Sequence, residues 1–125
     1  IGFAFSAAMG AWAANTGRPI LSVSGDGGFC QYLAEFTTAV KYKMNITHLL
    51  LNNVELGKIS KEQRAGEWPV WQTSLHNPNF AEFAQNCGGH GVRVENVSEL
   101  DNALAAAMAY DGPALVEVMS DAELI

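Results

Sequence analysis

Two polar residues follow two separate apolar stretches of the kind that form buried strands. Asp26 lies in the glycine-rich turn 25–28, after the stretch 20–24, and Asn53 comes soon after the stretch 46–51. The carboxyl ends of neighbouring parallel strands meet at one edge of a sheet, and ligands of such sheets bind there. We therefore expect Asp26 and Asn53 to lie close together.

The chemistry that these side chains support is the binding of a divalent cation and a phosphate. An ionised carboxylate and a side-chain carbonyl, with one backbone carbonyl just beyond Asn53, would place three oxygen atoms around one point. Mg²⁺ prefers oxygen ligands and usually takes the rest from substrate phosphates and water. Gly25, Gly27 and Gly28 let the backbone approach a ligand closely, and the helix after them presents its N-terminus to an anion. The pattern predicts a ligand that contains a diphosphate.

Two other interpretations compete with this one. A Gly-Asp-Gly turn is often only a turn, and an asparagine pair often only ends a strand, but both together on one strand–helix–strand unit favour a functional site. A dinucleotide-binding fold is the second alternative. It lacks support because Cys30 stands at the third glycine position of GxGxxG, and Asn52 and Asn53 stand where an acidic residue would end the second strand.

The elements that must hold these residues alternate between strands and helices. Short, largely apolar runs bounded by turn residues predict strands at 20–24, 46–51, 91–95 and 114–119, the first two buried on both faces. Apolar periodicity and capping signals predict helices at 3–14, 29–43, 56–63, 77–86 and 98–110. The alternation predicts an α/β fold, an open parallel sheet with helices on both faces, whose first two strands form a right-handed crossover.

Finer details of the helices are also predicted. The first helix is expected to stop at 15–17, and Pro78 to lie in the first turn of the fourth helix. Ser98 is expected to begin the capping box of the last helix. The first helix is expected to pack on the sheet through one stripe, which consists of Phe3, Ala7, Ala8 and Ala11.

The composition describes one folded domain with an acidic surface. Hydrophobic residues make up 49% of the 125 residues and charged residues 16%, which allows a real core and argues against disorder. The net charge of -6 repels phosphate chains, so nucleic acid is not an expected partner. The apolar stretch 1–14 is too short to span a bilayer and lacks a positively charged leader, so neither a transmembrane segment nor a signal peptide is predicted.

The cysteines predict a cellular compartment, and the first residue predicts a longer parent polypeptide. Cys30 and Cys87 have no CxxC spacing, which predicts core thiols in a reducing cytoplasm rather than a zinc site or a disulfide framework. The chain begins with isoleucine inside an apolar stretch, without a preceding turn signal, so we expect a fragment of a longer polypeptide.

The remaining candidate residues are histidines and tryptophans. His48, His76 and His90 have neither metal nor triad spacing, and we expect structural or surface roles for them. Trp68 and Trp71 lie in the least regular part of the chain. An interface or substrate-covering role and simple packing of the loop both remain open for this tryptophan pair.

The two motifs also resemble those of a known family. Gly25-Asp26-Gly27 followed by Asn52-Asn53 is similar to the signature of thiamine-diphosphate-dependent enzymes, and nearly the whole chain resembles their C-terminal diphosphate-binding domain. The segment 52–59 is most similar to the pyruvate oxidase and acetolactate synthase branch. The resemblance implies that 1–125 is a single C-terminal thiamine-diphosphate- and Mg²⁺-binding domain, part of a longer enzyme.

The resemblance assigns roles to residues of this chain. Asp26 and Asn53 would bind Mg²⁺ through their side chains, and Glu55 through its backbone carbonyl, although many relatives have glycine at the Glu55 position. Backbone amides of the turn would bind the diphosphate, and Leu56 would approach the cofactor or the substrate. The residues expected to bind the cofactor are Gly25, Asp26, Gly27, Gly28, Phe29, Asn53, Glu55 and Leu56.

The activity implied for the parent enzyme is decarboxylation of a 2-oxo acid such as pyruvate. A pyruvate oxidase-like reaction is the first expectation, with FAD bound in a domain not present here; acetolactate synthesis and simple decarboxylation are alternatives. No catalytic residue is assigned in this chain, because the activating glutamate of the family lies in a separate domain, usually of another subunit. The chain alone is thus expected to be inactive, and its parent to be a homodimer or homotetramer. A non-catalytic phosphate-binding or assembly module is the alternative of another class.

Overall fold

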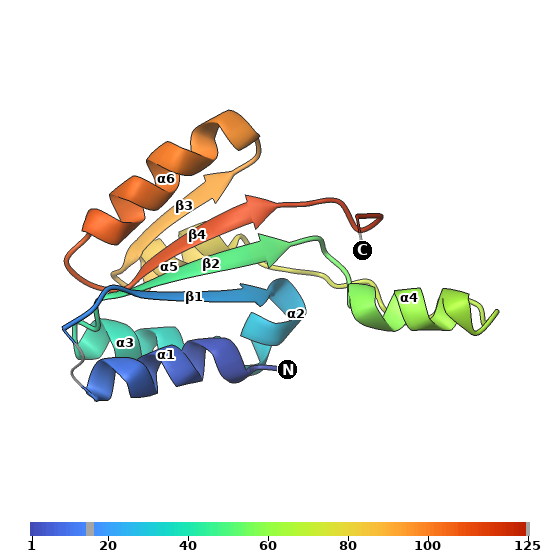
Figure 1. The fold of residues 1–125 in the computed structure, drawn as a ribbon, viewed down its shortest axis with the longest axis horizontal. Coiled ribbons are helices and arrows are strands. Elements are labelled where there is room, and N and C mark those ends of the chain that lie inside the picture. The colour runs from blue at the N-terminus through green and yellow to red at the C-terminus, as the bar shows by residue number, and fades with distance from the viewer. Residues whose placement is uncertain (15–16, 125) are drawn as a thin grey trace.

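The four predicted strands form one parallel sheet, shown in Figure 1 by a computed structural model that describes residues 1–14 and 17–124. The strands are β1 (Ile20–Gly25), β2 (Ile46–Asn52), β3 (His90–Val94) and β4 (Ala114–Met119). Their order in the sheet is β1-β2-β4-β3, and all three pairings are parallel. The prediction of an open parallel α/β sheet is confirmed.

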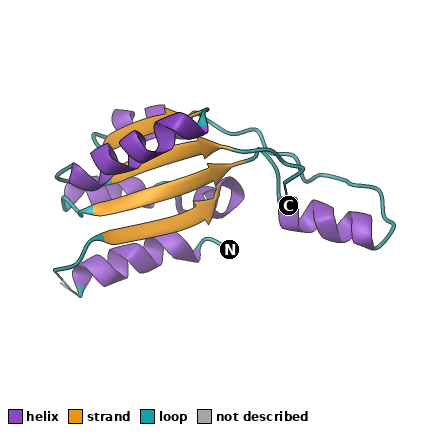
Figure 2. Ribbon diagram, turned by 45° about the horizontal axis from the view of Figure 1, so that its top comes forward, coloured by secondary structure: helices purple, strands orange, loops and turns teal. Residues whose placement is uncertain are grey.

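Helices cover both faces of this sheet. They are α1 (Phe3–Ala13), α2 (Asp26–Phe29), α3 (Glu35–Lys41), α4 (Gly57–Ala65), α5 (Phe80–Asn86) and α6 (Val97–Ala109). Residues of α1, α3 and α5 share one core cluster with Ile46, Leu50 and Leu115 of the sheet, whereas α6 packs on the other face against Val94 and Val116. Helix α4 and the loop after it extend beyond the carboxyl ends of the strands, away from the sheet (Figures 1 and 2).

The helix predicted over 29–43 is not continuous. Helix α2 precedes it, a 3-10 turn spans Cys30–Tyr32, and α3 begins only at Glu35. Two glycines in α2 weaken a continuous helix there, because glycine loses the most backbone entropy on folding. The apolar positions of the prediction still face inward: Phe36 and Met44 are buried, and Leu33 and Val40 pack against the core.

The stripe predicted for α1 is correct at Ala8 but wrong at Phe3 and Ala11, which are exposed. Phe3 is 78% exposed, whereas Phe5 and Ala8 are the buried residues of this helix. Phe5 packs against the rings of Phe29 and Phe36, with centroids 5.6 and 5.8 Å apart. Burial among aromatic rings decides the orientation of the helix, because small residues on nearly all its sides specify no stripe. The predicted stop at 15–17 falls partly on Asn15 and Thr16, which lie outside the described residues.

Two helices begin at asparagines rather than at the predicted residues. Pro78 lies outside α5, whose cap is Asn79, and the side chain of Asn79 accepts a hydrogen bond from the Glu82 amide at 3.0 Å. Asn96, not Ser98, forms the capping box of α6 together with Glu99. Asparagine binds a free amide of the first turn as well as serine does, so both signals were compatible with the sequence.

Strand β1 is not buried on both faces as predicted. Its Leu21 and Val23 are 50% and 49% exposed. They share a sheet face with α6, but α6 covers mainly β3 and β4 at the other side of the sheet. Because β1 is an end strand of the sheet, the part of this face that β1 forms remains uncovered among the described residues.

Candidate functional site

The two motifs meet at the carboxyl edge of the sheet. Gly25 at the end of β1 is paired with Leu51 of β2, so Asp26 and Asn53 both lie immediately beyond paired strand ends. Both residues line one cavity of about 610 Å³. Other expected cofactor-binding residues line it too, namely Gly25, Gly27, Gly28, Glu55 and Leu56. Phe29 does not, because its ring is buried beneath the turn and stacks on His48.

The carboxylate of Asp26 is almost fully buried and held by three donors. Its Oδ1 accepts a hydrogen bond from the Gly27 amide at 2.9 Å. Its Oδ2 accepts one from the Val54 amide at 2.9 Å and one from Asn77 Nδ2 at 2.7 Å. A carboxylate offers about two acceptor positions on each oxygen. Oδ2 is therefore saturated, and one position on Oδ1 remains for a further partner.

The other asparagine of the pair, Asn52, points away from the cavity. It continues the series Ile46, His48 and Leu50, whose side chains face α1, α3 and α5, as expected for alternate residues of a strand. Its Oδ1 accepts hydrogen bonds from Asn77 Nδ2 at 3.0 Å and from the Val54 amide at 3.2 Å, and its Nδ2 donates to Glu117 at 2.7 Å.

Glu117 lies at the inner end of this chain of contacts and is 0% exposed. Its Oε2 accepts a hydrogen bond from the Ala81 amide, in the first turn of α5, at 3.1 Å, and Arg93 Nη1 approaches Oε1 to 3.4 Å. Helix α5 lies so close to β3 that a Cβ on Gly91 would be 2.0 Å from the Ala81 carbonyl oxygen. We call the connected residues Asp26, Asn77, Asn52 and Glu117 the Asp26 network.

Sequence reasoning missed three members of this network. Asn77 was expected only to open a helix, Asn52 only to belong to the motif, and Glu117 only to lie in the last strand. A charged residue inside an apolar strand, as in Ala114–Met119, is the one signal that was available, because a buried carboxylate needs partners. Nothing in the local sequence pairs it with Asn52 or Asn77.

The backbone between Asn53 and Leu56 turns sharply. Val54 has φ of 58°, a left-handed conformation that a β-branched residue rarely adopts. The turn is held because the Leu75 amide donates to the Val54 carbonyl at 2.8 Å and the Leu56 amide donates to the Thr73 carbonyl at 2.7 Å. Strain of this kind persists where surrounding contacts impose it, often at functional sites.

The residues after the turn complete one wall of the cavity. The Glu55 carboxylate accepts a hydrogen bond from Thr73 Oγ1 at 3.1 Å, and the Asn53 Oδ1 accepts one from the Glu55 amide at 3.2 Å. Leu56 packs against the glycine turn, since a Cβ on Gly27 would lie 2.6 Å from its Cδ2. A glycine at position 27 thus lets Leu56 approach the floor of the cavity.

His48 forms a second buried polar cluster on the same face of the sheet. Its Nδ1 lies 2.6 Å from Ser22 Oγ and its Nε2 3.0 Å from Ser24 Oγ, and the rings of Phe5 and Phe29 pack around it. Burial lowers the pKa of His48 to about 4, so the imidazole is neutral near pH 7. The expected structural role of His48 agrees with these contacts. We call Ser22, Ser24 and His48 the His48 cluster.

Cys30 departs from the expectation of a core thiol. It lies in the outward-facing 3-10 turn and is exposed, while Cys87 is partly buried. Burial of the sulfur nevertheless raises the pKa of the Cys30 thiol, and the negative charge of Asp26 raises it further. The thiol therefore stays protonated beside the site.

The tryptophan pair lies outside the core of the domain, although the ring of Trp68 lies close to Gly66 at the end of α4. Trp68 and Trp71 are 72% and 70% exposed, in the loop after α4, and Gln63 of α4 fixes the loop through hydrogen bonds to the backbone of Trp71. Figure 2 shows α4 and this loop apart from the sheet. An interface or substrate-covering role and simple packing of the loop both stay predictions for this pair.

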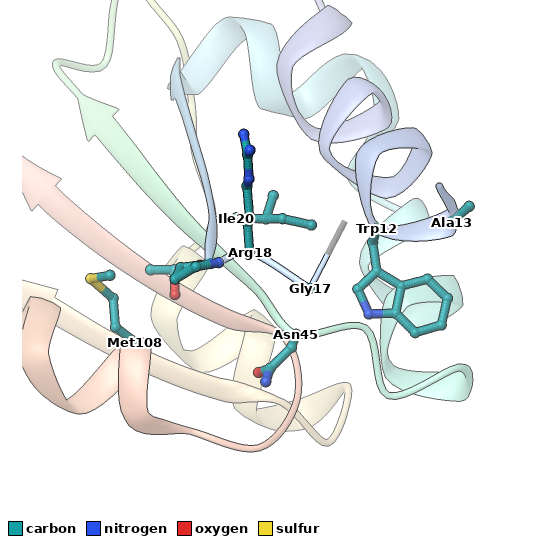
Figure 3. Close-up of a pocket in the computed structure, with 9 residues that line it drawn as sticks. Trp12, Ala13, Gly17, Arg18, Ile20, Asn45 and Met108 are labelled. Atoms are coloured by element: carbon teal, nitrogen blue, oxygen red, sulfur yellow. The ribbon is translucent and has the colours of Figure 1, made fainter. Parts of the chain in front are cut away.

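A second cavity, of about 580 Å³, opens at the amino ends of the strands (Figure 3). Trp12, Arg18, Asn45 and Met108 line it, from the end of α1, the loop before β1, the loop before β2 and α6, respectively. No residue expected to bind the cofactor is among those that line it.

Two further observations concern metal ligands and membrane-spanning helices. In residues 1–14 and 17–124, no group of three or more His, Cys, Asp or Glu side chains could hold a metal ion. A cation at the carboxyl edge would therefore combine one carboxylate with amide and backbone oxygens. In the same residues, no helix is both long and apolar enough to span a membrane.

Comparison with known families agrees with this geometry. Residues 1–118 match a family model described as "Thiamine pyrophosphate enzyme, C-terminal TPP binding domain". The chain belongs to this family. Thiamine pyrophosphate enzymes use the compound also called thiamine diphosphate, and the chain is the domain that binds it.

Curated relatives support the same family of thiamine pyrophosphate enzymes. The putative thiamine pyrophosphate-containing protein YdaP of Bacillus subtilis is 41% identical over 102 residues, which cover 82% of this chain and 18% of the relative. The catabolic acetolactate synthase of Raoultella terrigena is 36% identical, and an acetolactate synthase of Bacillus subtilis 31%, each over 97% of this chain. The chain spans 22% and 21% of these two synthases, so it matches about a fifth of its relatives' length.

Proposed function

We propose that the chain binds the diphosphate of thiamine diphosphate through Mg²⁺, as a single C-terminal domain, residues 1–125, of a longer enzyme that decarboxylates a 2-oxo acid. The observation that supports the metal is the Asp26 carboxylate, which is buried, held by three donors and left with one acceptor position on Oδ1. A rigid, partly satisfied carboxylate beside amide and carbonyl oxygens suits Mg²⁺, whose octahedral geometry tolerates little displacement.

Each residue around the cavity has a proposed task. Asp26 and Asn53 bind the ion through side-chain oxygens, and Glu55 through its backbone carbonyl, which leaves the Glu55 carboxylate free to bind Thr73. The Gly27 amide orients Asp26, while Gly28 and Phe29 offer amides to the diphosphate at the start of α2. Gly25 lets the chain turn from β1 into this helix, and Leu56 contacts the cofactor or substrate from the opposite wall.

The fit of the cofactor's charged end is supported by size and chemistry. A cavity of about 610 Å³ is within the range of small-molecule sites. When bound, thiamine diphosphate would supply the electron sink that decarboxylation of a 2-oxo acid needs. The protein groups described here bind and orient. We propose that the activating glutamate comes from outside this chain, so that residues 1–125 alone turn over no 2-oxo acid.

The parent reaction has two leading candidates. Acetolactate synthases among the relatives favour acetolactate formation, and the resemblance of 52–59 to pyruvate oxidases favours oxidative decarboxylation with FAD elsewhere in the protein. Simple decarboxylation is the third. Full-length protein supplied with pyruvate should give acetolactate, acetate or acetaldehyde, respectively. Absence of all three products, and of turnover of other 2-oxo acids, would remove the proposed reaction.

We also propose an oligomeric state and a compartment for the parent protein. The half-exposed Leu21 and Val23 and the exposed Trp68 and Trp71 favour a homodimer or homotetramer in which further protein covers them. Two cysteines without a disulfide favour the cytoplasm. Membership of an enzyme family speaks against a non-catalytic phosphate-binding or assembly module.

Substitution of Asp26 by alanine tests the metal assignment. We expect the Mg²⁺-dependent affinity of the full-length protein for thiamine diphosphate, measured by calorimetry, to fall about 100-fold or more, since even partners behind a ligand are worth 10–100-fold. Asp101→Ala is the matched control, because Asp101 is exposed on α6, on the other face of the sheet. Binding that depends on Mg²⁺ but is the same in Asp26→Ala would contradict the assignment.

A further inference from the structure

The Asp26 network contains two amides that do not face the cavity. Asn52 is 2% exposed, and Asn77 comes from the loop before α5, far along the chain from the two motifs. Neither lines the cavity described above. Their hydrogen bonds connect Asp26, at the edge of the cavity, to Glu117, in the core of the sheet.

Glu117 fixes the direction of this chain of hydrogen bonds. Its three partners are Asn52 Nδ2, the Ala81 amide and Arg93 Nη1, all of which are donors. A carboxylate surrounded by donors is in its ionised, acceptor-only form. Asn52 must therefore turn its amide nitrogen toward Glu117, which leaves its Oδ1 pointing toward Asn77 and the Val54 amide.

The same logic fixes Asn77. Its side-chain nitrogen lies 3.0 Å from Asn52 Oδ1 and 2.7 Å from Asp26 Oδ2, and both of these atoms are acceptors. The reverse orientation of the Asn77 amide would place an oxygen against two oxygens, so Asn77 can only donate. Glu117 thus orients the Asn52 amide, and Asn52 orients the Asn77 amide. As a result, Asn77 donates a hydrogen bond to Asp26.

That donor determines which oxygen of Asp26 stays available. With Asn77 and the Val54 amide both on Oδ2, that oxygen has no acceptor position left, whereas among the described residues Oδ1 is bonded only by the Gly27 amide. We propose that Asn77, oriented by Glu117 through Asn52, is a positioning residue that makes Asp26 a one-oxygen ligand through Oδ1. This inference rests on the proposed Mg²⁺ site and extends it to residues outside the two motifs.

Asn77→Ala in the full-length protein tests the inference, with Asn79→Ala as the matched control. Asn79 lies two positions along the same loop and caps α5, but it has no contact with Asp26. Mn²⁺ replaces Mg²⁺ as the probe, so that bound metal is counted by electron paramagnetic resonance in the presence of thiamine diphosphate, without turnover. Thermal unfolding of each variant is recorded alongside.

We expect Asn77→Ala to weaken Mn²⁺ binding at least tenfold, the lower end for partners that orient a ligand. Saturating Mn²⁺ should restore the full amount of bound cofactor. Asn79→Ala should lower the unfolding temperature, through its lost cap, but keep Mn²⁺ affinity within twofold. Equal losses of Mn²⁺ affinity in both variants, or none in Asn77→Ala, would overturn the positioning role. Failure of the unsubstituted protein to bind Mn²⁺ would remove the proposed function and the inference together.

Discussion

Two buried polar clusters lie on the same face of the sheet and differ in how they end. In the His48 cluster, both ring nitrogens have a serine partner and aromatic rings cover the imidazole, so every polar atom is satisfied within the protein. The Asp26 network is equally well bonded at its inner end, at Glu117, but its outer end keeps one acceptor position at a cavity.

The difference shows how one sheet combines stability with binding. A closed cluster adds hydrogen bonds to the folded state and leaves nothing for a ligand to bind. An open network leaves a buried carboxylate incompletely satisfied, which disfavours the empty protein and favours the bound one. The closed cluster also lies directly beneath the open site, because Phe29, which directly follows the glycine turn, stacks on His48.

The largest loss of stability should come from a substitution of Glu117, at the inner end of the Asp26 network. Glu117→Gln introduces a donor among three donors and removes a buried charge facing Arg93. We expect a loss of about 3 kcal/mol in the free energy of unfolding, measured with urea, together with weaker Mn²⁺ binding. Glu95→Gln is the matched control, because Glu95 pairs with the same arginine but its side chain is 67% exposed. Its loss should stay below about 0.5 kcal/mol; similar losses in both variants would contradict this reading of the network.

The His48 cluster, which is the closed one, should make the free energy of unfolding depend on pH. Burial lowers the pKa of His48 from 6.5 to about 4, so the unfolded chain takes up a proton near pH 6.5 that the folded protein takes up only near pH 4. Stability due to neutral His48 is thus complete above pH 6.5 and is lost as the pH falls toward 4. The loss is on the order of 3 kcal/mol.

Urea unfolding between pH 7 and pH 4 checks this pH dependence. His48→Gln removes the titrating group. Between pH 7 and pH 4 its free energy of unfolding should therefore fall less than that of the unsubstituted protein, by the amount that His48 contributes. His76→Gln, at an exposed histidine, should retain the original slope. Identical slopes in all three proteins would disprove the role of His48. Unchanged Mn²⁺ affinity in His48→Gln at pH 7 would sharpen the distinction between the two clusters.

The smallest effect concerns the backbone beside the open network. Val54→Asn should raise the free energy of unfolding by about 1 kcal/mol, because asparagine tolerates the left-handed conformation that valine resists, and Val54 is already 40% exposed. Val70→Asn, at a valine of 42% exposure without a positive φ, should bring no gain. Equal effects of the two substitutions in thermal unfolding would show that Val54 is not strained.

The sequence predicted those parts of the site that follow from strand order. Asp26 and Asn53 could be placed together because each follows an apolar strand, and parallel strands end at one edge. Asn77 could not, because its position depends on the loop 66–79, which is held by a bridge between Glu55 and Ser74 and by other long-range contacts. No periodic pattern in that loop records where its side chains will lie.

The same limit explains the errors in the fold. Strand and helix types were predictable from periodicity, but the rotation of α1 was decided by rings from three separate elements around Phe5. Burial of β1 on both faces was inferred from composition alone. How far α6 extends over the sheet is a matter of packing, which the residues of β1 do not encode.

The outer position of β1 has a practical consequence for anyone who purifies this chain. A strand at the end of a sheet presents unpaired amide and carbonyl groups along one side, and these serve as a template for another extended chain. Leu21 and Val23 of the same strand add exposed apolar surface to that template. Concentrated solutions of residues 1–125 should therefore self-associate edge to edge, and a charged substitution such as Val23→Lys should keep them dispersed.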